Sequence, residues 1–216
     1  MTLAILEIIT GFILALISSM LLVKSKISYS GDKKERFDFR SVLFPFTVYL
    51  ASDITMIILI HHNSGLFESV SMVMLANILF ILAIIDIKKR VIPNRYIFTM
   101  LILRVLSVSV YGVFTGKFIE YIIILSAGAV TGFFVTGIIS LISRKSLGAG
   151  DVKMFAMIGA FTGITGVIDI LIYSAIFCAA AGMVFIAMKK CTIKSCLPMA
   201  PFGFMGTILF VFLGCV

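Results

Sequence analysis

The chain has 216 residues, of which 61% are hydrophobic and only 13% are charged, and its mean hydropathy is +1.20. Soluble domains carry about a quarter charged residues, so this composition excludes a soluble globular domain of useful size. The net charge of +8 is compatible with a nucleic-acid partner, but the basic residues are distributed in a way that points to a membrane.

The apolar residues fall in runs of about 20, the length that crosses a bilayer as an α-helix. These runs predict an all-α, polytopic membrane protein with about eight transmembrane helices, forming a single integral-membrane domain over residues 1–216. The division between the sixth and seventh spans rests on a weak turn from Gly163 to Gly166. The expected spans are 3–23, 42–60, 67–86, 96–114, 118–142, 153–167, 168–188 and 198–215.

The basic residues predict the topology. Sixteen of the 18 lie in four segments between the expected spans: 24–41, 87–95, 143–153 and 189–197. With eight spans all four segments fall on the same side, and positive charge marks cytoplasmic loops. The N-terminus is therefore expected outside and the four basic segments inside. The charge excess then needs no nucleic-acid partner, and the expected environment is the lipid bilayer of the cell membrane.

Two aspartates lie at the expected cytoplasmic ends of spans. Asp86 ends the apolar run from Leu75 to Ile85, and Asp151 lies in a polar break with Gly148 and Gly150. An ionisable group at the edge of a hydrocarbon-spanning segment is costly to place, which indicates a functional site. Their matching depth suggests that the fold holds the two carboxylates together at one face of the membrane.

Two carboxylates within reach of one water share a proton and titrate as a pair. The ionised member can take a proton from water while the protonated member donates to a carbonyl oxygen, as in aspartic proteases. The alternative is that each acid pairs with a nearby base. Asp86 would then pair with Lys88 or Lys89, and Asp151 with Lys153 or Arg144.

Local patterns predict how these segments fold. Pro93 disfavours a helical residue before it, so the third span should end near Val91, and Asn94 is a candidate N-cap for the next. Gly148 and Gly150 permit a positive φ or the close approach of another segment. Three glycine pairs at i, i+4 spacing are suited to close helix–helix contact. They are Gly112/Gly116, Gly128/Gly132 and Gly159/Gly163.

Other polar residues leave alternatives open. Asp53, in the middle of the expected span 42–60, is either a neutral structural acid bonded to Ser52 or Thr55, or binds a basic group of a substrate. Arg104, inside the span 96–114, either pairs with an acid or extends to the membrane surface. Cys191 and Cys196 lack the second pair of ligands that a structural zinc site needs, so neither a metal nor a cofactor is expected.

Three motifs together resemble the type IV prepilin leader peptidases. Gly148 to Asp151 resembles their GxGD motif, and Asp86 to Asn94 resembles their first aspartate motif, an acid followed by basic residues and Ile-Pro-Asn. Pro198 to Gly203 resembles the Pro-Phe-Gly segment before their last helix. The three occur in the family's order, and the resemblance covers about residues 75–216.

The resemblance implies an intramembrane aspartic endopeptidase that acts at the cytoplasmic face of the membrane. Such enzymes remove the short basic leader of prepilin-like or preflagellin-like proteins, just before a hydrophobic N-terminal helix that stays in the bilayer. Asp86 and Asp151 would be the catalytic residues. Gly148, Gly150 and Lys153 would belong to the active-site loop, and Asp53 is a possible substrate-binding residue.

The sequence departs from the larger members of that family, which carry a cytoplasmic insert with zinc-binding cysteines. The corresponding segment, Lys24 to Ser41, is short and has no cysteine. We therefore expect the peptidase activity without the N-methyltransferase activity. The sequence does not identify the substrate, and it leaves the oligomeric state open.

Two other functions compete with this one. A presenilin-like GxGD protease would carry a Tyr-Asp motif and a Pro-Ala-Leu segment, where this chain has Ile85-Asp86 and Pro198-Met199-Ala200. A small proton-coupled carrier could use Asp53, Asp86 and Asp151 as a relay. Carriers place such acids near the midplane and often contain inverted repeats, whereas here two of the three acids lie at one edge and no repeat is evident.

Overall fold

The computed structural model describes residues 66–142, 147–188 and 197–213. The chain divides into two compact units, Met1–Asn77 and Ile78–Val216, which are described separately. Helix α3 (Leu66–Lys89) crosses the division, so its first half is the described part of the first unit. The expected spans 3–23 and 42–60, the N-terminal orientation and Asp53 lie outside the described residues. The single-domain organisation stays a prediction.

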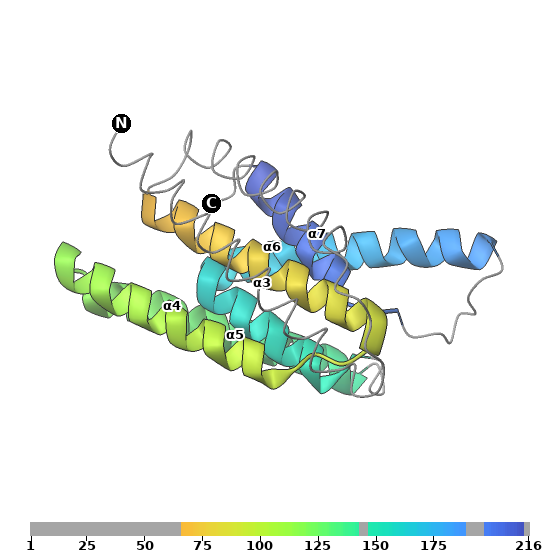
Figure 1. The fold of residues 1–216 in the computed structure, drawn as a ribbon, viewed down its shortest axis with the longest axis horizontal. Helices are drawn as coiled ribbons and strands as arrows, with labels where there is room; N and C mark the ends of the chain where they lie inside the picture. Colours follow the sequence, from red (N-terminus) through yellow and green to blue (C-terminus); the bar gives the residue numbers. More distant parts are fainter. Residues whose placement is uncertain (1–65, 143–146, 189–196, 214–216) are drawn as a thin grey trace, which may run out of the picture. The chain divides into compact units, whose positions relative to one another are not determined.

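The second unit continues from α3 through four further helices (Figure 1). They are α4 (Asn94–Thr115), α5 (Phe118–Ile142), α6 (Ala149–Ala187) and α7 (Ala200–Phe212). The regular structure within the described ranges is entirely helical. Helices α3 to α6 are long and apolar enough to cross a membrane, whereas α7 is shorter. This confirms an all-α membrane protein, while the count of eight transmembrane helices stays a prediction.

Most of the expected spans in the described ranges match helices. The spans 67–86, 96–114 and 118–142 correspond to α3, α4 and α5, with ends that differ by at most three residues. The expected last span, 198–215, contains α7. Hydropathy located these helices because each apolar run is bounded by a charged or glycine-containing turn.

The division expected between residues 167 and 168 is wrong. Helix α6 continues across it, and the break lies earlier, at Gly163, whose φ of 73° and ψ of −168° are not helical. That backbone conformation is essentially restricted to glycine. Figure 1 shows the two parts of α6 running in different directions. The expected turn from Gly163 to Gly166 therefore contains the break, at its first residue.

Helix α6 packs most extensively against α5, and glycines allow the contact. A Cβ atom added to Gly128 on α5 would overlap the carbonyl oxygen of Gly159 on α6, and one added to Gly132 would overlap that of Phe155. The backbones thus touch directly, as small residues permit in membrane helices. The expected packing role is confirmed for Gly128, Gly132 and Gly159, and Gly163, whose Cα also lies against Gly128, breaks the helix as well.

Arg104 on α4 supports the broken helix. Its side chain is buried, and its guanidinium donates hydrogen bonds to the carbonyl oxygens of Ala160 (3.3 Å) and Phe161 (3.2 Å). The same group lies 5.0 Å from the centre of the Phe161 ring. A helix end leaves carbonyl groups that need donors from elsewhere, and Arg104 supplies them just before Gly163. It does not extend to the membrane surface.

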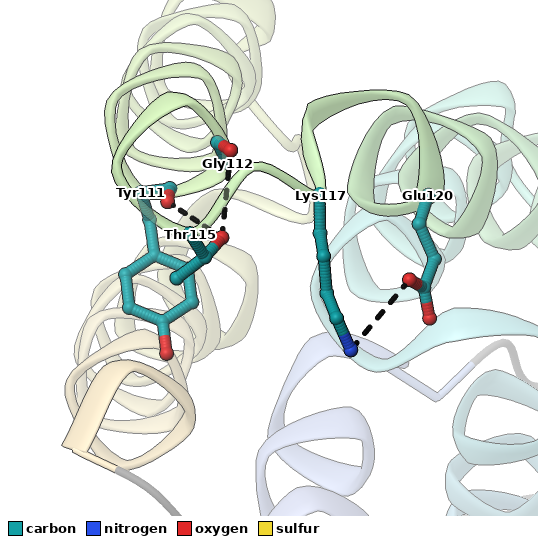
Figure 2. A network of polar contacts seen from close by, with 5 residues as sticks. All are labelled: Tyr111, Gly112, Thr115, Lys117 and Glu120. Atoms are coloured by element: carbon teal, nitrogen blue, oxygen red, sulfur yellow. Dashed lines mark hydrogen bonds and ion pairs between the residues drawn. The ribbon is translucent and has the colours of Figure 1, made fainter.

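The turn from α4 to α5 is closed by backbone and side-chain contacts (Figure 2). Gly116 caps α4 in the left-handed conformation, with φ 71°, so its expected role in helix packing is wrong. The Thr115 hydroxyl donates to the carbonyl oxygen of Tyr111 at 2.9 Å. Lys117, just before α5, and Glu120 in its first turn are both exposed and form an ion pair of 3.9 Å.

Candidate active site

Asp86 lies in the last turn of α3 and is 5% exposed. Helix α3 ends at Lys89, close to the end expected from Pro93, and Arg90 follows with a φ of 52°. The Arg90 amide donates to the carbonyl oxygen of Asp86 at 2.8 Å, which closes the helix end. A non-glycine residue in this left-handed conformation is strained, and such strain often accompanies functional sites.

The carboxylate of Asp86 is held by the start of α7. Its Oδ2 atom accepts a hydrogen bond of 3.1 Å from the backbone N–H of Ala200, the first residue of that helix. The first N–H groups of a helix have no partner within it and carry the positive end of its dipole. Pro201 has no N–H group, so the donor comes from Ala200. The Pro-Met-Ala-Pro segment thus places a donor beside Asp86.

Asp151 is the third residue of α6 and is half-buried. Its Oδ2 atom accepts a hydrogen bond of 3.0 Å from the backbone N–H of Gly148, the N-cap residue. The Asp151 amide in turn donates to the Gly148 carbonyl oxygen at 3.0 Å. This is the carboxylate half of a capping box, and Gly148 has no side chain to supply the other half. Asp151 thus lies at the positive end of its own helix, whereas Asp86 contacts the positive end of α7.

Neither of the two motif glycines, Gly148 and Gly150, has a left-handed backbone, and at Gly150 the absence of a side chain is what matters. Gly148 has a φ of −71° and a ψ of 152°, which any residue can adopt. Of the two expected alternatives, a positive φ does not apply to Gly148. Gly150 lies within the first turn of α6, where an added Cβ would be 3.0 Å from the Cβ of Ile92. The expected close approach is correct for Gly150, because the segment after Asp86 packs directly on it.

Lys153 makes a second contact between α6 and the segment that follows Asp86. Its Nζ atom donates a hydrogen bond of 3.2 Å to Oδ1 of Asn94, the first residue of α4. Pro93, not Asn94, is the N-cap of α4, and no side chain caps that helix, so the expected cap is wrong. The Asn94 side chain instead serves as the acceptor for Lys153.

The contacts of Gly150 and Lys153 join the segment that follows Asp86 to the first turn of α6, which carries Asp151. The alternative was that each aspartate forms an ion pair with a nearby basic residue, and the structure describes the contacts of Lys153. The ammonium group of Lys153 is directed to Asn94, while Arg144 and the side chain of Lys88 lie outside the described residues.

The described part of the site combines the two carboxylates with Lys153 and with contacts from Ile92 and Ala200. Within the ranges 66–142, 147–188 and 197–213, no three His, Cys, Asp or Glu side chains gather as metal ligands would. Two residues that shape it, Ile92 and Ala200, were not among the predicted site residues. Ile92 acts by contact and Ala200 by its backbone, so neither side chain marks the site. A proline in the first turn of a helix was the available signal for Ala200.

Comparison with known proteins identifies the family. The model of the type IV leader peptidase family matches residues 73–183, a range that includes both Asp86 and Asp151. No curated protein and no solved structure matches the chain. The match covers half of the sequence and includes both aspartates, Gly148, Gly150 and Lys153, while Ala200 lies beyond it. The chain belongs to the type IV leader peptidase family.

Proposed function

We propose that this protein is an intramembrane aspartic endopeptidase with Asp86 and Asp151 as its catalytic pair. It removes the short basic leader from type IV prepilin-like or preflagellin-like proteins. The observation that carries the proposal is the packing of the segment after Asp86 on the first turn of α6, which carries Asp151, with both aspartates inside the family's matched range. Family membership also favours this activity over that of a presenilin-like protease.

The proposed mechanism of peptide-bond cleavage follows from placing two carboxylates close together. Because two neighbouring carboxylates do not both ionise cheaply, the pair holds one proton. The ionised member takes a proton from water while the water oxygen attacks the scissile carbonyl carbon. The protonated member donates its proton to the carbonyl oxygen. As the tetrahedral diol collapses, the member that took the proton from water gives it to the leaving nitrogen, the other member takes a proton from a diol hydroxyl, and the C–N bond breaks. The pair then again holds one proton.

The place of the aspartates supports a cut near the membrane surface. Asp86 lies in the last turn of α3 and Asp151 in the first turn of α6. A substrate whose hydrophobic helix stays in the bilayer would present its leader junction at this depth. The distribution of basic residues supports the cytoplasmic face. The negative pair would also attract a basic leader toward the site.

The test is mass spectrometry of a short-leader prepilin-type substrate after incubation with the purified protein in lipid. We expect one cut at the leader–helix junction, and a rate at least about a hundredfold lower in Asp86→Asn and in Asp151→Asn, because each removes an acid–base catalyst. The matched control is Asp169→Asn, which neutralises an acid in the second part of α6 and should cut normally.

Two results would contradict the proposal. Cleavage retained in both asparagine variants would show that Asp86 and Asp151 are not a catalytic pair. No cut in a broad substrate panel would favour a proton-coupled carrier, and proton-flux measurements on the same proteins would then test that function.

A further inference from the structure

Ser140 lies in the last turn of α5 and reaches the segment before Asp151. Its hydroxyl donates a hydrogen bond of 2.9 Å to the carbonyl oxygen of Leu147, seven residues further along the chain. Leu147 immediately precedes Gly148, the N-cap of α6. Ser140 therefore contacts the backbone that holds the Asp151 carboxylate, although it does not touch Asp151.

Other hydroxyls on α5 behave differently. Thr131 and Thr136 donate to the carbonyl oxygens of Ala127 and Gly132, four residues earlier in the same helix. This is the usual partner of a helical serine or threonine. Ser140 instead directs its hydroxyl out of α5, so its bond connects two elements.

The Leu147 carbonyl and the Gly148 N–H belong to one planar peptide group. The oxygen of that group accepts from Ser140 (2.9 Å), and its nitrogen donates to Oδ2 of Asp151 (3.0 Å). Both polar atoms of the peptide are thus engaged, which fixes the orientation of its plane. Hydrogen bonds in such a chain also polarise and strengthen one another.

We propose that Ser140 is a positioning residue that orients the Asp151 carboxylate through the Leu147–Gly148 peptide. The inference rests on the proposed catalytic role of Asp151. Without the hydroxyl, the peptide can rotate, and the carboxylate loses its fixed donor direction. The loss falls on the chemical step and not on substrate binding, because Ser140 acts on the carboxylate.

The experiment compares the cleavage kinetics of Ser140→Ala, Ser140→Thr and Ser126→Ala in lipid. Ser140→Ala should lower kcat by about three- to tenfold, the effect expected of one hydrogen bond, with KM unchanged. Ser140→Thr keeps the hydroxyl and should restore kcat. Ser126→Ala removes the same group from the same helix, where it bonds the Ile123 carbonyl oxygen, and should match the wild type.

A second measurement does not depend on activity. Hydrogen exchange of the Gly148 amide, followed by NMR with ¹⁵N-glycine labelling, should be faster in Ser140→Ala and normal in Ser140→Thr. Unchanged exchange in Ser140→Ala would overturn the inference, even if the wild type cut no substrate and the proposed function failed. If Ser140→Ala had the full kcat while Asp151→Asn was inactive, the role of Ser140 would be overturned and the proposed function would stand.

Discussion

Asp86 and Asp151 are held by the same kind of bond from very different places in the chain. Asp86 accepts its backbone hydrogen bond from a residue 114 positions later, and Asp151 from one three positions earlier. Asp151 lies in the first turn of its own helix, where the dipole favours a carboxylate. Asp86 lies in the last turn of α3, where the dipole disfavours one, and the start of α7 offsets this. One carboxylate is supported locally, and the other depends on long-range packing.

The largest effect should come from separating α6 from α5. In Gly159→Ala the new Cβ would overlap the carbonyl oxygen of Gly128, so the two backbones must move apart and carry Asp151 with them. We expect unfolding free energy to fall by about 1–3 kcal/mol, the usual cost of overpacking, and cleavage to be largely lost. Thermal unfolding in detergent and the leader-cleavage assay measure the two effects.

The control for this change is Gly137→Ala on α5. An added Cβ at Gly137 has no atom within 4 Å, and alanine is the better helix former. Stability and cleavage should therefore be retained. Equal losses in Gly137→Ala and Gly159→Ala would show that the backbone contact between α5 and α6 does not position Asp151.

The local support of Asp151 can be removed by itself. The φ of −71° at Gly148 suits proline, but Gly148→Pro replaces the N–H that donates to Asp151 with a ring carbon. Because hydrogen bonds to charged groups contribute about 1.5–3 kcal/mol, kcat should fall by roughly tenfold or more. Single-turnover cleavage rates measure this.

Gly148→Ala provides the comparison. It keeps the N–H and adds a Cβ 3.3 Å from Oδ2 of Asp151, so a smaller loss is expected. If alanine and proline reduced the rate equally, crowding at Gly148 and not its N–H would be responsible.

The smallest effect concerns the bond between Lys153 and Asn94, which is exposed. Lys153→Met and Asn94→Ala should each lower kcat/KM by about two- to fivefold, because exposed polar pairs contribute about 0.2–1 kcal/mol. The double variant should be no worse than either single one, since both remove the same bond. Multiplied losses would instead mean that the two side chains act independently.

The difference between the two aspartates also explains what the sequence could predict. The arrangement around Asp151 is local, so its GxGD motif indicated both the polar break and the close approach at Gly150. Helices α3, α4 and α5 were predicted because each is a long apolar run between charged or glycine-containing turns.

Long-range contacts could not be predicted in the same way. The donor to Asp86 is a backbone N–H of α7, and the partners of Arg104 are backbone carbonyls of α6. Backbone groups carry no residue-specific signal in the sequence. The division in α6 was placed too late, after residue 167, because the sequence marks only a weak turn from Gly163 to Gly166, and the packed structure shows that Gly163 leaves the helix.

The central claim is that the two carboxylates act as one catalytic unit. The most direct test is the single-turnover cleavage rate of Asp86→Asn, Asp151→Asn and the double variant, measured in lipid with a labelled leader substrate. Residues that act as a unit have non-additive effects. We predict that the double variant is no slower than the slower single variant. Losses that multiply in the double variant, or a single variant with the wild-type rate, would contradict the account.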